Sequence, residues 1–285
     1  LYLEELIRDA AAGRGEARHS TVLAMLQARL LRLDGPARRV LRVASVFGPT
    51  FWRGGIRALC ADPIDETLLS ETLRMLQAAE LIEPHTESRV PGDEEYVFRH
   101  ALVSDAAYGL LTDEDRRVGH QLAGQFLEAA GEANPMVVAE HYRRGGCLER
   151  AIAPYTCAAE QALAAHDLDA ALERVRLAIG CRAEGVALGT LHGLCCMAHF
   201  WRDDFEAGYT HGALALSLLP PGEQRYMQAL GNMLTFTSLL GKHAEFRRLV
   251  GDFGVLTPSP KALGAFRRLA KKPSMGFPAM RMTIP

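Results

Sequence analysis

Four side chains of the types that bind metals recur along one predicted helix. His192, Cys195, Cys196 and His199 fall at i, i+3, i+4 and i+7, so they share one side of that helix. Histidine nitrogen and cysteine sulfur are the usual protein ligands of zinc. One straight helix cannot close a tetrahedral site, and the sequence contains no Cys-x-x-Cys pair. The pattern therefore favours packing in a helical core, with zinc binding as the alternative.

A second candidate for chemistry is His100, where a predicted strand runs directly into a predicted helix. Alternation along the strand puts Tyr96, Phe98 and His100 on one face, and the helix that follows has an apolar stripe. The pattern predicts an imidazole held between two apolar surfaces, where an unpartnered polar group costs free energy. A backbone carbonyl or Asp105 would supply the partner.

The residues from the end of this strand into the next two helices form a motif: Phe98, Arg99, His100, Asp105, Tyr108, Arg116 and His120. This motif resembles the segment that joins the winged-helix and tetratricopeptide parts of bacterial signal-transduction ATPases. Those regulators combine an AAA-like nucleotide-binding core, a winged helix and helical repeats. They are often fused to a serine/threonine protein kinase, a nucleotide cyclase or a DNA-binding output domain. The resemblance covers roughly residues 1 to 250.

The resemblance implies a role for His100 and the neighbouring Arg99 in nucleotide sensing. In the resembled ATPases, a winged-helix histidine reaches the phosphates of bound ADP and holds the closed state. The alternative for His100 is a structural hydrogen bond within its own domain. We expect no cofactor in this chain itself; the resemblance implies ATP or ADP in the intact parent, whose ATPase core would be one partner.

Catalytic motifs are missing from the sequence. A phosphate-binding P-loop requires Gly-x-x-x-x-Gly-Lys-Ser/Thr, whereas Gly241-Lys242 is followed by His243. The glycine-rich loop and the His-Arg-Asp triplet of protein kinases are also absent. We therefore expect this chain to be no enzyme. The resemblance implies a parent that is an ATPase, and among the possible fusions we favour one to a serine/threonine protein kinase.

The charge distribution argues against nucleic acid as a partner. The whole chain carries −2, and six basic residues with no acidic one follow Asp252, which leaves −8 on residues 1–252. Phosphate contacts need the opposite sign. A fragment of a DNA-binding transcriptional regulator remains the alternative, but its recognition helix at 65–80 would carry four acids and one arginine: Asp65, Glu66, Glu71, Glu80 and Arg74.

The six cysteines show no framework of spacings, which indicates reduced thiols and a cytoplasmic protein. No apolar run approaches the roughly 20 residues that span a bilayer, so we expect no membrane partner. The chain opens at Leu1 rather than Met, and we expect a fragment or a processed product.

The elements that position these residues are mainly α-helical. We expect helices at 21–33 (capped by Ser20), 36–47, 55–60 and 65–80, then strands at 81–83 and 95–99. Three of these helices followed by the β-hairpin give the order of a winged helix, which we place at residues 21–115. Residues 1–20 would be the end of an ATPase lid helix and a linker. The basic, proline-containing residues 258–285 are expected to be disordered.

Residues 116–257 are predicted to form a tetratricopeptide-like α-helical repeat array. Second helices of successive pairs are expected to begin near Leu148, Leu168, Phe205 and His243. The last two intervals, 37 and 38 residues, lie near the roughly 34 to 40 residues of such repeats. The array would bind a protein partner or a signal ligand. A freestanding helical-repeat scaffold is the third alternative.

Overall fold

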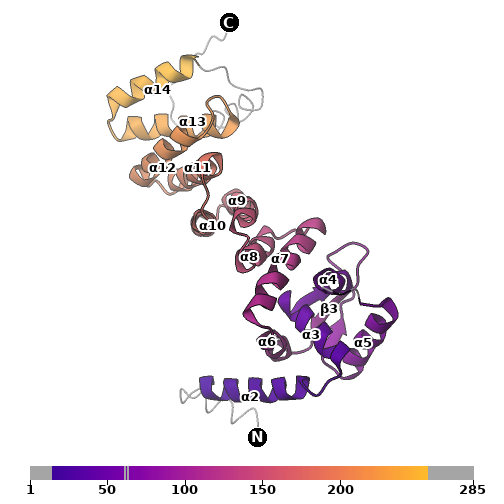
Figure 1. The fold of residues 1–285 in the computed structure, drawn as a ribbon. Coiled ribbons are helices and arrows are strands. Elements are labelled where there is room, and N and C mark those ends of the chain that lie inside the picture. The colour runs from indigo at the N-terminus through magenta and orange to yellow at the C-terminus, as the bar shows by residue number, and fades with distance from the viewer. Residues whose placement is uncertain (1–14, 61, 63, 256–285) are drawn as a thin grey trace. The chain divides into compact units, whose positions relative to one another are not determined.

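The computed structural model describes residues 15–60, 62 and 64–255. Over these residues the chain is mainly helical, as the sequence predicts, with thirteen helices and three short strands. It divides into two compact units, Leu1–Ala151 and Ile152–Pro285; their elements are labelled in Figure 1. Most of the predicted lid-helix end and linker, residues 1–14, and the predicted tail at 258–285 lie outside the described residues.

The first unit contains all three strands. Its elements are α2 Gly15–Leu30, α3 Gly35–Val46, β1 Thr50–Trp52, α4 Arg53–Leu59, α5 Glu66–Ala78, β2 Ile82–Pro84, β3 Glu95–Phe98, α6 Ala101–Gly109, α7 Asp113–Ala129 and α8 Pro135–Arg144. Helix α9, Leu148–Ala164, begins in this unit and continues into the second. The predicted domain boundary between residues 115 and 116 falls inside the first unit.

Local start signals explain α3 and α5. The side chain of Asp34 accepts a hydrogen bond from the Ala37 N–H at 2.8 Å, and Pro36 occupies the first turn. Asp65 caps α5 in the same way. The apolar residues that recur along the two helices are buried together in the core: Val40, Leu41 and Ala44 from α3, and Leu69, Leu73 and Leu76 from α5.

The three strands form an antiparallel sheet with β3 in the centre, in the order β1-β3-β2. The sequence predicts the β2–β3 hairpin but not β1, which is only three residues long. The central residue of β1, Phe51, is fully buried, and its ring stacks on Tyr96 with 5.7 Å between centroids. Aromatic packing therefore holds strand β1 in the sheet. Three residues are too few to show the alternation by which a strand is predicted.

One expectation for the first helices is wrong. Helix α2 begins at Gly15, so Ser20 lies inside the helix and does not cap it. Serine costs less than about 1 kcal/mol in a helix interior, which is too little to interrupt it. Phe47 is only partly buried, because it lies just beyond α3, where its ring packs edge-on against Trp52 and Phe126.

The second unit is helical throughout its described part. After α9 it contains α10 Leu168–Gly180, α11 Gly185–Trp201, α12 Phe205–Leu218, α13 Gln224–Leu239 and α14 His243–Val255. The four predicted helix starts, including Leu148 of α9, are confirmed. Among the described helices, none combines the length and apolar character required to cross a bilayer.

The turns before α9, α10, α12 and α14 share one hydrogen-bond pattern. In each turn, a residue with positive φ is followed by an N–H that bonds to the carbonyl five positions earlier, as in a Schellman motif. The positive-φ residues are Gly146, His166, Asp203 and Gly241. The bonds run from Cys147 to Tyr142, Asp167 to Ala162, Asp204 to His199 and Lys242 to Thr237.

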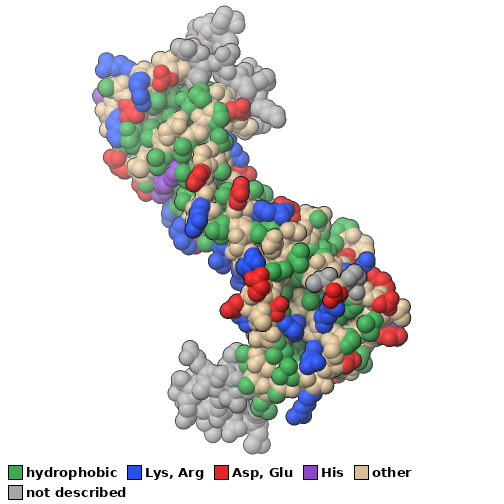
Figure 2. All heavy atoms as spheres, in the orientation of Figure 1, with side chains coloured by type: hydrophobic (Ala, Val, Ile, Leu, Met, Phe, Trp, Pro, Cys, Tyr) green, Lys and Arg blue, Asp and Glu red, His purple; other side chains and the backbone are tan. Residues whose placement is uncertain are grey.

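Glycines let α12 approach α13 closely. A Cβ on Gly208 would lie 2.5 Å from the Phe236 ring, and one on Gly212 would overlap the Met233 side chain. Phe236 and Met233 are both buried in the core of this unit. Larger residues on this face of α12 would push the two helices apart. On the face of the molecule in Figure 2, acidic and basic side chains are interspersed with apolar ones.

Candidate functional site

The structure divides the motif between the core and the two ends of α6. Phe98 packs in the core, with its ring 5.2 Å from that of Phe51. Arg99 and His100 lie at the amino-terminal end of α6, and both are exposed. Tyr108 lies near the carboxyl-terminal end and contacts residues of α7. The motif therefore contributes to two distinct groups of side chains.

At the amino-terminal end, Arg99 is already engaged by two acids. Its Nη1 lies 3.1 Å from Glu80 and its Nε lies 3.3 Å from Glu83. Both pairs are exposed to solvent, where an ion pair contributes about 0 to 1 kcal/mol. The guanidinium is thus oriented by weak contacts that a stronger anion could replace.

The expectation that the His100 imidazole is enclosed between apolar surfaces is wrong. Strand β3 ends at Phe98, and His100 occupies the N-cap position of α6 with an extended backbone (φ −135°, ψ 131°). Its side chain makes no cap hydrogen bond. The ring is exposed, and within the described residues neither Asp105 nor a backbone carbonyl is hydrogen-bonded to it. An imidazole placed there is free to donate a hydrogen bond to an external anion.

At the other end of α6, three motif residues come together. The Tyr108 hydroxyl lies 2.9 Å from His120 Nε2. The Arg116 guanidinium stacks over the Tyr108 ring at 4.9 Å and donates to the Tyr108 carbonyl at 3.4 Å. These contacts fix the end of α6 against the first two turns of α7.

The group continues to a residue that the sequence analysis did not select, His141 of α8. Its Nδ1 lies 3.0 Å from His120 Nδ1, and both rings are buried. Burial, with a smaller contribution from Arg144, lowers the pKa of His120 to about 4. Burial, the nearby His120 and Arg144 lower the pKa of His141 to about 3. No sequence signal links the two histidines, which are 21 positions apart.

The Tyr108–His120–His141 chain connects α6, α7 and α8 through neutral hydrogen bonds. One of the facing nitrogens must donate and the other accept, so the tautomer of one ring fixes the tautomer of the other. Because the rings are buried, loss of one partner would leave the other unsatisfied in the interior. This chain therefore holds three helices in register, whereas His100 faces outward at the opposite end of α6.

The four candidate metal ligands of α11 differ in burial and in the residues that they contact. Cys195 and Cys196 are buried, while His192 and His199 are half-buried. His192 Nδ1 lies 2.9 Å from Nδ1 of His211 in α12, and the His199 ring stacks on the same His211 ring. His211, like His141, is a partner that the sequence analysis did not select.

Burial shifts the pKa values of this group. It raises the pKa of both Cys195 and Cys196 to about 12, so both sulfurs are protonated thiols in this packed core. Burial also lowers the pKa of His192. Across residues 15–60, 62 and 64–255, no group of three or more His, Cys, Asp or Glu side chains is arranged to hold a metal ion.

Comparison with known proteins does not assign this chain to a family. No family model matches the chain, and no solved structure matches it significantly. The uncharacterized protein R02095 of Rhizobium meliloti (strain 1021) is 30% identical over 141 residues. That stretch is 48% of this chain but only 13% of the relative, so the chain matches a small part of that much longer relative.

Proposed function

We propose that this chain is a regulatory and protein-interaction region of a multidomain bacterial signalling ATPase in the cytoplasm, without catalytic activity of its own. Fusion to a serine/threonine protein kinase is the output that we favour. The observation that carries the proposal is the exposed His100 at the start of α6, within the motif that resembles these ATPases. The match to 13% of a much longer protein is consistent with a multidomain parent.

In this proposal, residues from α3 to β3 form a winged helix. The order α3-β1-α4-α5-β2-β3 fits that fold, with the β2–β3 hairpin as the wing. His100 follows the second strand of the wing and would reach the phosphates of ADP bound to the parent's ATPase core. Arg99 would leave Glu80 and Glu83 to add a second positive group.

The helices from α7 onward would then form tetratricopeptide-like hairpins that bind a protein partner or a signal ligand. The support is the turn repeated before α10, α12 and α14, whose starts at Leu168, Phe205 and His243 follow one another by 37 and 38 residues. A turn with one geometry, used at similar intervals, is how helical hairpins stack into an array.

Hydrogen exchange in the intact parent tests the nucleotide relay. We expect the amides of residues 99–103 to exchange more slowly with ADP than with a non-hydrolysable ATP analogue, because the closed state covers this end of α6. The amides of α13 serve as an internal control. Equal exchange in the two nucleotide states at residues 99–103 would overturn the proposed relay.

A gel shift at low salt separates this proposal from a DNA-binding regulator. Helix α5, the recognition helix of a winged helix, exposes Glu71, and its Glu66 is paired with Arg53 at 2.6 Å and with Arg57 at 2.8 Å. We expect the chain to leave duplex DNA unshifted. A salt-sensitive shift, weakened by Arg74→Glu on α5, would instead support the DNA-binding alternative.

A further inference from the structure

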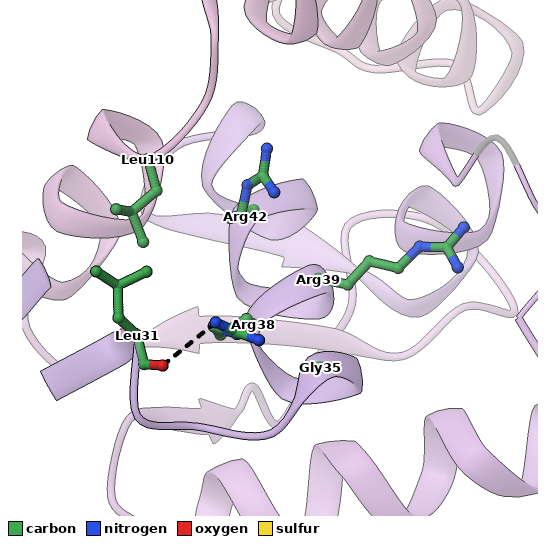
Figure 3. Close-up of a pocket in the computed structure, with 6 residues that line it drawn as sticks. All are labelled: Leu31, Gly35, Arg38, Arg39, Arg42 and Leu110. Atoms are coloured by element: carbon green, nitrogen blue, oxygen red, sulfur yellow. Dashed lines mark hydrogen bonds between the residues drawn. The ribbon is translucent and has the colours of Figure 1, made fainter. Parts of the chain in front are cut away.

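Helix α3 presents three arginines to one cavity of the first unit. The cavity has a volume of about 530 Å³. Arg38 and Arg39 are adjacent on α3 and Arg42 lies one turn further along, while the two leucines follow the ends of α2 and α6 (Figure 3). No acidic side chain is among the residues that line it: Leu31, Gly35, Arg38, Arg39, Arg42 and Leu110.

Two of these arginines contact aspartates at the cavity edge. Arg42 Nη2 lies 2.9 Å from Asp115, and Arg39 Nη2 lies 2.8 Å from the Asp62 carbonyl and 4.0 Å from its carboxylate. The Asp62 side chain is 90% exposed and that of Asp115 is 46% exposed. Exposed pairs contribute about 0 to 1 kcal/mol, so a carboxylate from outside would replace either aspartate at small cost.

The remaining positive charge is less well compensated. Arg38 Nη1 donates to the Leu31 carbonyl at 3.3 Å, and within the described residues no carboxylate is paired with it. The surface therefore combines the Arg38 guanidinium with the apolar side chain of Leu31, which is 53% exposed.

We propose that this surface binds an acidic segment of a protein partner: an extended peptide with carboxylates along its length and an apolar side chain that packs on Leu31 and Leu110. The three guanidinium groups point in different directions (Figure 3), which suits charges spaced along a chain and does not enclose a single phosphate. This site is separate from the helical repeats to which the proposed function assigns partners.

A labelled short peptide of repeating Glu-Glu-Leu, titrated with the full chain at physiological salt, tests the proposal by fluorescence anisotropy. We expect saturable binding that Arg38→Glu weakens by at least about tenfold, because like charges then face each other. Arg38 makes no ion pair within the described residues, so this variant should keep its fold, which circular dichroism checks. Arg74→Glu, an exposed arginine on α5 outside the cavity, changes the net charge equally and should alter affinity by less than about twofold.

Three outcomes would overturn the proposal. One is the absence of saturable binding. Another is an equal effect of Arg38→Glu and Arg74→Glu, which would indicate diffuse charge attraction. The third is tighter binding of a single-stranded oligonucleotide than of the peptide. A peptide with serine in place of leucine should bind several-fold more weakly, and unchanged affinity would contradict the assigned role of Leu31 and Leu110.

Discussion

The Nδ1 atoms of His120 and His141 lie 3.0 Å apart in the interior of the first unit. Only one of two facing nitrogens carries a hydrogen, so at least the accepting imidazole is neutral in this contact. Burial is the main cause of the low pKa of each ring, about 4 for His120 and about 3 for His141. The pair therefore makes folding of this unit sensitive to acid.

The first unit should lose stability as the pH falls below 6.5. The ordinary histidine pKa of 6.5 applies to the unfolded chain, which binds protons that the folded pair excludes until the pH approaches 4. Stability is thus complete above pH 6.5 and declines on acidification. We expect the free energy of unfolding to fall by about 2 to 4 kcal/mol between pH 7 and pH 5. Urea unfolding followed by Trp52 fluorescence, in a Trp201→Phe background, measures it.

A double variant, His120→Leu with His141→Leu, is the matched control. It removes both imidazoles of the buried contact together, so only the part-buried Tyr108 hydroxyl loses a partner, and the pH dependence should become much flatter. If the first unit of the unsubstituted chain were equally stable at pH 7 and pH 5, the neutral histidine pair would play no part in folding.

Replacing a strained residue in the repeated turn should stabilise the second unit. Asp203 has φ +58° at the position that Gly146 and Gly241 occupy in the equivalent turns. A residue with a Cβ pays about 1 kcal/mol in this conformation, so Asp203→Gly should raise the free energy of unfolding by about 0.5 to 1 kcal/mol. Gly241→Ala should lower it by a similar amount. Urea unfolding monitored by Trp201 tests both, and a loss of stability in Asp203→Gly would refute the shared turn geometry.

The close contact between α12 and α13 predicts that two glycine-to-alanine variants will differ in their effect on stability. Gly208→Ala places a methyl group against the buried Phe236 ring and should cost about 1 to 3 kcal/mol. Gly251→Ala, in α14, meets nothing within 4 Å and should be neutral or stabilising by up to about 1 kcal/mol. Thermal unfolding of the two proteins is the measurement, and equal melting temperatures would contradict the close helix approach.

Thiol reactivity tests the assignment of the α11 cysteines to the core. Cys157 is exposed, whereas Cys195 and Cys196 are buried with a pKa of about 12. A disulfide reagent at neutral pH should modify Cys157 rapidly and the other two only after unfolding, because the thiolate is the reactive form. Mass spectrometry of the labelled peptides identifies the sites. Rapid labelling of Cys195 would show that α11 is not packed as described.

Much of the helical part of the fold follows from local signals in the sequence. Asp34 and Asp65 cap α3 and α5, and the starts of α9, α10, α12 and α14 fall at the predicted residues. These features depend on a few neighbouring residues. Strand β1 is too short to show alternation, and it is held by the Phe51–Tyr96 contact across the sheet.

The side-chain groups were harder to predict because they depend on distant partners. Nothing near His120 points to His141, and nothing near His192 points to His211. The placement of His100 failed for a local reason. Strand alternation predicts a face shared with Phe98, but the strand ends at Phe98 and the chain turns to begin α6.

The ADP affinity of the intact parent with His100→Ala tests the proposed nucleotide sensor most directly. We expect ADP to bind about 10- to 100-fold more weakly, the value of one hydrogen bond to a charged group, and basal output to rise. His85→Ala, which removes another exposed histidine of the first unit, is the control and should leave affinity unchanged. Unaltered ADP affinity in His100→Ala would contradict the proposed nucleotide sensor.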